Sequence, residues 1–395
     1  MDILKLIGRT SELFEEDLQK HNPEIERLVR TNRFLVIGGA GSIGKAVVKE
    51  IFKRNPLKLH VVDISENNLV ELVRDLRSTY GYIDGDFQTF ALDAGSKIYD
   101  AFIQADGKYD YVLNLSALKH VRSEKDVFTL MRMIEVNVLN TIKTIEQSIS
   151  NGTKKYFCVS TDKAANPVNL MGATKRVMEL YLADLGEKIA ISSARFANVA
   201  FSDGSLLHSF EERLKNNHPI VAPTDVKRYF VTPKESGILC LMSCLFGENG
   251  EIYFPKLDEK EHLVSFTEIA DKFLYEKGYK PVYCSSEEEA RASVEELKNK
   301  KEWPCFYSVS DTTGEKAFEE FYMENESISL ENYTDLGIVK QSLIADKNQL
   351  QVFLNEINQF VRQEYWTKEE LVQNIRMLLP EFDYEDKGKY LDAKM

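Results

Sequence analysis

A glycine-rich run between residues 38 and 44 is the first part of the chain whose residue types and spacing suggest chemistry. It reads GGAGSIG, after a short apolar segment at 33–38 and before a helical pattern at 43–53. Small residues let the chain turn tightly and let its backbone approach a diphosphate, whose charge the free N–H groups of the following helix stabilise. We therefore predict a dinucleotide-binding loop formed by Gly38, Gly41, Ser42, Ile43 and Gly44.

Asp63 ends the next apolar segment, LHVVD, 19 positions after Gly44. A carboxylate at this place accepts hydrogen bonds from both ribose hydroxyls and repels a 2′-phosphate, and no Arg or Lys follows it at 64–66. The cofactor that we predict is therefore NAD rather than NADP. Asp93 follows the strand candidate at 88–92, where it would either contact the adenine or cap a helix.

Three more polar residues, Thr161-Asp162-Lys163, follow an apolar strand candidate at 155–159. Taken alone, an Asp-Lys pair after a strand is typical of a surface ion pair. The run is followed, however, by a proline and by a long helical pattern at 169–185. Residues at the ends of buried parallel strands gather at the edge of the sheet where ligands bind, so this run is a candidate reaction centre.

Strand and helix patterns alternate from about residue 31 to residue 200, with a last strand candidate at 190–196. This alternation predicts a parallel sheet that is covered on both faces. We expect an α/β protein with a Rossmann-type, doubly wound parallel sheet, a smaller mixed substrate domain and a helical C-terminal part. The expected domains are a helical extension at 1–30, a cofactor-binding domain at 31–200 with part of 230–250 packed against it, a substrate-binding portion at 201–290 and a mostly helical region at 291–395.

The composition argues against several classes of function. The net charge of −13 disfavours nucleic acid and anionic membranes as partners, because their phosphates would repel the chain. The five cysteines are scattered without metal-ligand spacing, so we predict no metal site and a reducing, cytoplasmic location. The first 30 residues read as one or two charged helices with a break at Asn22-Pro23, and no apolar run is long enough to span a membrane.

Taken together, the motifs resemble those of a known family. The glycine loop is accompanied by NLSALKHV at 114–121, STDKAANPVNLMGATKR at 160–176, RFANV at 195–199 and KRYFVT at 227–232. Over about 34–236 the chain resembles the extended short-chain dehydrogenase/reductases, and within them the nucleotide-sugar 4,6-dehydratases of polysaccharide biosynthesis. It is most similar to the branch that acts on UDP-N-acetylglucosamine, which implies a UDP-sugar as the substrate.

The resemblance implies that hydride leaves sugar C4, a base takes the C5 proton, an acid protonates the departing C6 hydroxyl, and hydride returns to C6. The family's usual YxxxK pair is replaced by Met171 and Lys175, and methionine cannot exchange a proton. In the MxxxK branch, which is expected to retain configuration at C5, the proton work falls to the Thr-Asp-Lys run. Asp162 would be the acid, with a raised pKa, and Lys163 the base, with a lowered pKa, while Thr161 relays the O4 proton and Lys175 orients the ribose.

Substrate contacts are expected on both sides of this centre. Lys119 and His120 follow the strand candidate at 111–115, where Lys119 would lie near the sugar or the cofactor. His120 would either contact the substrate or be a buried structural histidine. The resemblance implies that Asn198 contacts the diphosphate and Arg228 the phosphate or uracil, the alternative for Arg228 being a solvated loop charge.

The resemblance also implies that Asn137 stabilises the active site through backbone contacts. It places a dimer interface on the helices around 126–150 and 169–185, so we predict a homodimer or a higher homo-oligomer. Two other functions stay open: a UDP-sugar epimerase or oxidoreductase of the same fold, and a non-catalytic NAD-binding regulator. An epimerase would be expected to keep the tyrosine, whereas a regulator would tolerate Asp162→Asn.

Overall fold

The computed structural model describes residues 1–310, 314, 316, 318–340, 346–386 and 388, and its largest element within them is a nine-stranded sheet. The order of the strands is β15-β16-β11-β6-β5-β4-β1-β2-β3. All neighbours from β11 to β3 pair parallel, and β16 and β15 continue the sheet antiparallel. The strands are β1 (Arg33–Ile37), β2 (Lys58–Asp63), β3 (Asp86–Ala91), β4 (Tyr111–Asn114), β5 (Lys155–Thr161), β6 (Ala190–Phe196), β11 (Glu251–Pro255), β15 (Ser327–Ser329) and β16 (Leu336–Lys340).

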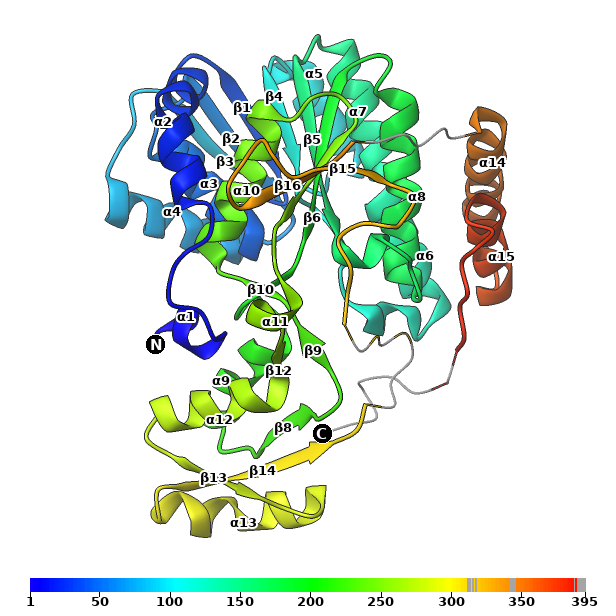
Figure 1. The fold of residues 1–395 in the computed structure, drawn as a ribbon. Coiled ribbons are helices and arrows are strands. Elements are labelled where there is room, and N and C mark those ends of the chain that lie inside the picture. The colour runs from blue at the N-terminus through cyan, green and yellow to red at the C-terminus, as the bar shows by residue number, and fades with distance from the viewer. Residues whose placement is uncertain (311–313, 315, 317, 341–345, 387, 389–395) are drawn as a thin grey trace.

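Helices cover both faces of this sheet (Figure 1), which confirms the predicted Rossmann-type architecture. Alternate residues of a strand face opposite sides, so in β1 Phe34 and Val36 pack into one apolar cluster and Leu35 and Ile37 into the other. The first cluster is covered by α2 (Glu15–Arg30), α3 (Ser42–Phe52), α4 (Glu66–Tyr80) and α10 (Pro233–Phe246). The second is covered by α5 (Lys97–Asp106), α6 (Val127–Ile134), α7 (Asn140–Ser150) and α8 (Leu170–Leu185).

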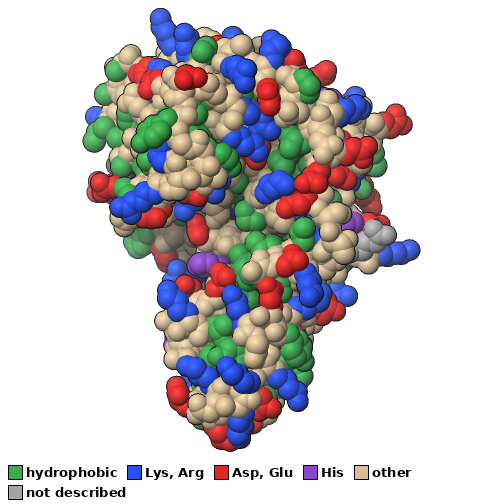
Figure 2. Space-filling view, turned by 90° about the vertical axis from the view of Figure 1, so that its left-hand side faces the viewer, with side chains coloured by type: hydrophobic (Ala, Val, Ile, Leu, Met, Phe, Trp, Pro, Cys, Tyr) green, Lys and Arg blue, Asp and Glu red, His purple; other side chains and the backbone are tan. Residues whose placement is uncertain are grey.

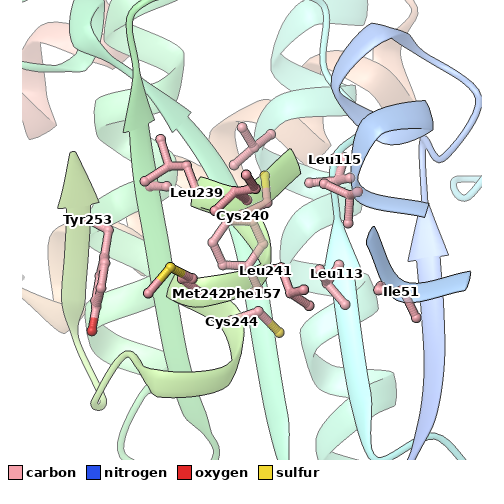
Figure 3. Close-up of a cluster of buried hydrophobic side chains, with 14 of the residues drawn as sticks. Ile51, Leu113, Leu115, Phe157, Leu239, Cys240, Leu241, Met242, Cys244 and Tyr253 are labelled. Atoms are coloured by element: carbon pink, nitrogen blue, oxygen red, sulfur yellow. The ribbon is translucent and has the colours of Figure 1, made fainter. Parts of the chain in front are cut away.

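Helix α10 is buried on all sides, although it comes from the second half of the chain. Figure 3 shows Cys240, Leu241 and Cys244 of α10 beside Phe157 of β5, with Leu113 of β4 next to Leu241. Both cysteines are therefore part of the apolar core. A Cβ at position 237 would come within 2.7 Å of a backbone oxygen of α3, so a glycine there lets the two helices pack closely.

A smaller unit lies below the sheet in Figure 1, and Figure 2 shows a hollowed waist between it and the larger body. Its core is formed by large side chains such as Phe210, Phe273 and Trp303. Its parallel sheet contains β8 (Ile220–Pro223), β14 (Glu302–Ser308) and β13 (Lys280–Tyr283), packed with α9 (Leu206–Lys215), α12 (Phe266–Glu276) and α13 (Glu287–Asn299). The connections between the two units include β7 (Asn198–Val199), β9 (Lys227–Arg228), β10 (Phe230–Val231), α11 (Glu259–His262) and β12 (Val264–Ser265).

The chain after residue 291, which we expected to be mostly helical, contains strands as well. Strand β14 belongs to the smaller unit, and β15 and β16 extend the large sheet. The helical part is α14 (Lys347–Gln363) and α15 (Lys368–Leu378), which pack on α8 and α6. Tyr181 of α8 donates a hydrogen bond to the Leu350 carbonyl. This hairpin therefore covers part of the surface on which we placed the predicted dimer contact.

The N-terminal residues connect the two units. Helix α1 (Ile3–Leu6) packs into the core of the smaller unit, and α2 packs on the large sheet. Between them the Arg9 guanidinium binds the Glu235 carboxylate through two hydrogen bonds of 2.8 and 2.6 Å, and both groups are buried. The break expected at Asn22-Pro23 is wrong: Pro23 lies inside α2, because burial of Ile25 and Val29 against the core outweighs the helix propensity lost at proline.

A fully buried guanidinium ties the last strands to the sheet. Arg195 of β6 donates hydrogen bonds to the carboxylates of Glu179 in α8 and of Glu326, and to the Phe321 carbonyl. Burial alone would raise the pKa of Glu179, but Arg195 and Arg176 hold it at about 2. The segment before β15 is thereby fixed against β6 and α8. No described helix is both long and apolar enough to cross a membrane.

Replacing Glu326 with Ala is expected to lower the free energy of unfolding by about 3 kcal/mol, because it leaves part of a buried charge without its partner. Urea denaturation followed by circular dichroism measures the loss. Glu324→Ala, which removes an exposed carboxylate from the same segment, is the control and should change stability by less than about 0.5 kcal/mol. Equal stabilities of the two variants would contradict the importance of the Arg195 contacts.

Candidate active site

Two adjoining cavities of about 310 Å³ each lie where the parallel strands end. Both are lined by Gly38, Gly41, Leu115 and Ala117, so the glycine loop forms their common wall. One cavity extends toward the ends of β2 and β3, and the other toward the end of β5 and the start of α8. This arrangement suits a ligand that crosses the carboxyl edge of the sheet with its middle against the glycines.

The glycines of this loop have distinct structural roles. Gly38 has a φ of +73°, and a Cβ there would come within 2.6 Å of the Ser116 nitrogen. Gly44 lets the start of α3 pack against Gly38 and Gly39. A Cβ at Gly41 would have only one neighbour, at 3.6 Å, and no described side chain caps α3 at this residue. The N–H groups of residues 38–41 donate hydrogen bonds within the fold, so the donors that remain for a ligand at this wall are those of the first turn of α3.

Two carboxylates line the first cavity, where an adenosine would lie. Asp63 accepts hydrogen bonds of 2.9 Å from the N–H groups of Ala40 and Ser65, which fix its orientation at the end of β2. Asp93 accepts one hydrogen bond from Gly95 N–H and one from the Arg132 guanidinium. The alternative that Asp93 caps a helix is wrong, because Ser96 caps α5. Each carboxylate oxygen retains lone-pair capacity for ligand hydroxyls.

The polar run after β5 lines the second cavity together with Met171 and Lys175 of α8. Thr161 Oγ1 donates a hydrogen bond of 2.9 Å to Asp162 Oδ1, and Lys163 Nζ donates one of 3.1 Å to the same oxygen. The Asp162 carboxylate is buried at the base of the short turn η3 (Asp162–Ala164). The pair is thus part of a cavity wall and not the surface ion pair that the run alone suggested.

The structure corrects the expected protonation of Lys163. Burial alone would lower the pKa of Lys163, but the carboxylates of Asp162 and Glu319 outweigh it and hold the pKa above its usual value. Lys163 is therefore an ammonium in this arrangement, whereas a base needs the neutral amine. In contrast, burial lowers the pKa of Lys175, whose Nζ donates a hydrogen bond of 3.1 Å to the Val159 carbonyl.

The expected substrate contacts fall into two groups. Lys119, His120 and Asn198 line the second cavity, and Asn198 Nδ2 has no partner among the described residues. His120 is exposed and lies against Gly204, so it is not a buried structural histidine. Arg228 is buried rather than solvated, but it does not line this cavity. Its guanidinium donates a hydrogen bond to the Lys316 carbonyl.

Asn137 lies in a π-helical turn, η2 (Glu135–Leu139), between α6 and α7. Its side chain accepts a hydrogen bond from Leu118 N–H and donates to the Leu118 carbonyl and to Thr174 Oγ1. Asn137 is fully buried. π-helical turns often occur at functional sites. Asn137 thereby connects the loop that carries Lys119 to the first turns of α8.

Two buried glutamates of the site are absent from the sequence-based prediction. Glu124, at the end of the turn η1 (Val121–Glu124), accepts a hydrogen bond of 2.8 Å from Met171 N–H at the start of α8. Glu319 lies 3.7 Å from Lys163 Nζ. No local pattern distinguishes either residue from an exposed glutamate. Their burial depends on segments that are distant in sequence.

The fold and the glycine loop define an α/β protein of the extended short-chain dehydrogenase/reductase type. The chain belongs to the polysaccharide biosynthesis protein family, whose model matches residues 34–341. The solved structure of Pen from Bacillus thuringiensis superimposes with a TM-score of 0.66 at 22% identity, over 89% of this chain and 99% of Pen. This likeness shows the fold alone.

The proteins that are similar to this chain in sequence differ in the activity that their names state. The uncharacterized membrane protein MJ1061 of Methanocaldococcus jannaschii is 30% identical over 91% of this chain and 99% of its own length. An inverting UDP-N-acetylglucosamine 4,6-dehydratase of Campylobacter jejuni is 29% identical over 56% of this chain and 66% of its own. A UDP-glucose 4-epimerase of Rickettsia bellii is 27% identical over 56% of this chain and 65% of its own. Two of these relatives are thus named for different reactions of UDP-sugars, and the first is named for none.

Glu124 gives the stability of the protein a characteristic pH dependence. Burial raises the pKa of Glu124 from 4.5 to about 7, so the folded state favours the protonated carboxyl. This contribution to stability is complete below pH 4.5 and is lost as the pH rises through about 7. Glu124→Gln, which keeps an acceptor for Met171 N–H, should therefore gain up to about 3 kcal/mol over wild type between pH 5 and pH 8.

Urea denaturation at several pH values measures this difference. Glu146→Gln, on the exposed face of α7, is the control and should follow the wild-type curve. Parallel curves for Glu124→Gln and wild type would show that the buried carboxyl does not titrate in this range.

Proposed function

We propose that the protein is an NAD-dependent 4,6-dehydratase of UDP-N-acetylglucosamine, which retains configuration at C5 and supplies deoxyamino sugars for surface glycans. One observation carries the proposal. Thr161, Asp162 and Lys163 line a cavity that continues from the glycine loop, while Met171 occupies the place where relatives of this fold carry a proton-exchanging tyrosine. A dehydratase can use the Asp-Lys pair instead, whereas an epimerase has no need of it.

The residues present fit the cofactor. The uncapped start of α3 and the open surface at Gly41 would hold the diphosphate, and Asp63 would accept hydrogen bonds from the adenosine ribose. Lys175, next to Met171 in the second cavity, would orient the other ribose. NAD, when bound, supplies a reversible acceptor for the hydride of the sugar.

The contact between Asp162 and Lys163 offers a route to both groups that elimination needs. Transfer of one proton from Lys163 Nζ to Asp162 Oδ1, across 3.1 Å, breaks an N–H bond and forms an O–H bond. The ammonium and carboxylate become a neutral amine and a carboxylic acid. The amine then removes the C5 proton and the acid protonates the leaving C6 hydroxyl, while Thr161 contacts O4.

The decisive experiment incubates the purified protein with UDP-N-acetylglucosamine without an added reductant. Mass spectrometry and proton NMR are expected to show the loss of one water and a new C6 methyl signal. Asp162→Asn should lower kcat at least about 100-fold, because it removes a general acid. Asp184→Asn, on the far end of α8, is the control and should keep the wild-type rate.

The outcomes separate the competing functions. A product of unchanged mass with inverted C4 would indicate an epimerase, and unchanged substrate with bound NAD would favour a regulator. Either result would overturn the dehydratase proposal.

The first cavity, which Asp63 lines, predicts a preference between NAD and NADP. Wild-type protein should bind NAD more tightly than NADP, because Asp63 repels a 2′-phosphate. Asp63→Asn should weaken NAD binding about 10-fold, because a charged hydrogen bond is lost. The difference in affinity between NAD and NADP should become smaller. Isothermal titration calorimetry measures both affinities, with Asp75→Asn on α4 as the control. Equal binding of NAD and NADP to wild type would contradict the role given to Asp63.

A further inference from the structure

A carboxylate from a distant part of the chain lies beside the candidate reaction centre. The Lys163 ammonium contacts two carboxylates, with Asp162 Oδ1 at 3.1 Å and Glu319 Oε1 at 3.7 Å. The Glu319 side chain is 2% exposed, and its Oε2 has no hydrogen-bond partner among the described residues. Burial raises the pKa of the Glu319 carboxyl, and the nearby Lys163 ammonium acts against that rise and favours the carboxylate.

The residues that follow Glu319 hold it in place. The Phe321 carbonyl accepts a hydrogen bond from Arg195 Nη1, and the Phe321 ring stacks on Phe254 of β11. Five residues further on, Glu326 binds the same guanidinium through both of its oxygens. Arg195 is fully buried in β6, the neighbour of the strand β5 that ends at the reaction centre. The position of the Glu319 carboxylate is therefore determined by the core of the sheet.

We propose that Glu319 is a positioning residue, whose carboxylate holds the Lys163 ammonium against Asp162 and keeps it protonated in the ligand-free protein. The inference rests on the proposed function, in which Lys163 exchanges a proton with Asp162. Glu319 would then determine how readily that proton leaves Lys163.

The charged groups around Lys163 set the direction of the effect. Asp162 comes from its own turn, Glu319 from the segment before β15, and Arg228 from β9, while Lys316 lies near Glu319. Arg228 Nη2 is 3.9 Å from Glu319 Oε1, so Glu319 also compensates the charge of Arg228. Removal of the Glu319 charge takes a stabilising neighbour from Lys163 and strengthens the repulsion by Arg228. Both changes favour the neutral amine.

The test measures the pKa of the Lys163 amine in the full-length protein. Acetic anhydride acylates only the neutral amine, so peptide mass spectrometry of protein labelled at a series of pH values gives the titration of Lys163. Glu319→Gln is expected to lower this pKa by about one unit. Glu320→Gln removes an exposed carboxylate from the adjacent position and should leave the pKa unchanged.

A third variant covers the case in which Glu319→Gln does not fold. Glu319→Asp keeps the charge but draws it back from Lys163, so it should lower the pKa by less than about one unit. A Lys163 titration that is the same in wild type, Glu319→Gln and Glu319→Asp overturns the proposal. An equal fall in Glu320→Gln overturns it as well, because the effect would then not depend on the buried contact.

The pH dependence of turnover is a second readout. The limb of the kcat profile that reports Lys163 should move to lower pH in Glu319→Gln by the same amount as in the labelling. A purely structural role would lower kcat without moving this limb. If the wild type turns over no UDP-sugar, the proposed function fails, and the labelling alone decides on Glu319.

Discussion

The buried guanidinium of Arg195 is the interaction on which much of this structure depends. A fully buried positive charge is tolerated only where carboxylates and carbonyl oxygens satisfy its donors, and Arg195 finds these on α8 and on the segment before β15. Removing that segment would leave a charge in the core. The return of the chain to the sheet after the smaller unit is therefore part of the stability of the sheet itself, and it brings Glu319 to Lys163.

Two segments, one near the N-terminus and one in the last third of the chain, connect the two units around the site. The N-terminal segment connects the units through Arg9, whose buried partner Glu235 begins the core helix α10. The C-terminal segment crosses back from the smaller unit to β11 through β15 and β16. A cavity between two units keeps its shape only if the units are held together, and these two connections supply that restraint.

Local patterns in the sequence predict the parallel sheet and its glycine loop, because strand and helix periodicities depend on neighbouring residues. All the strand candidates from 33–38 to 190–196 correspond to β1 to β6. The predictions are wrong where contacts between residues far apart in the sequence determine the local structure. Pro23 stays helical because its neighbours are buried. Strands β14 to β16 form because they pair with other strands, β14 in the sheet of the smaller unit and β15 and β16 in the large sheet. Glu124 and Glu319 look like any exposed glutamate until the fold buries them.

The protonation of Lys163 shows why motif and mechanism are separate questions. The motif requires an acid and a base, and considered singly each residue would need its own shifted pKa. The structure instead places an ammonium within hydrogen-bond distance of a carboxylate, so a single proton transfer creates both reactive forms together. What matters is then the energy difference between the charged and the neutral pair. Surrounding charges set that difference, and the nearest of them, on Glu319 and Arg228, come from segments outside the motif.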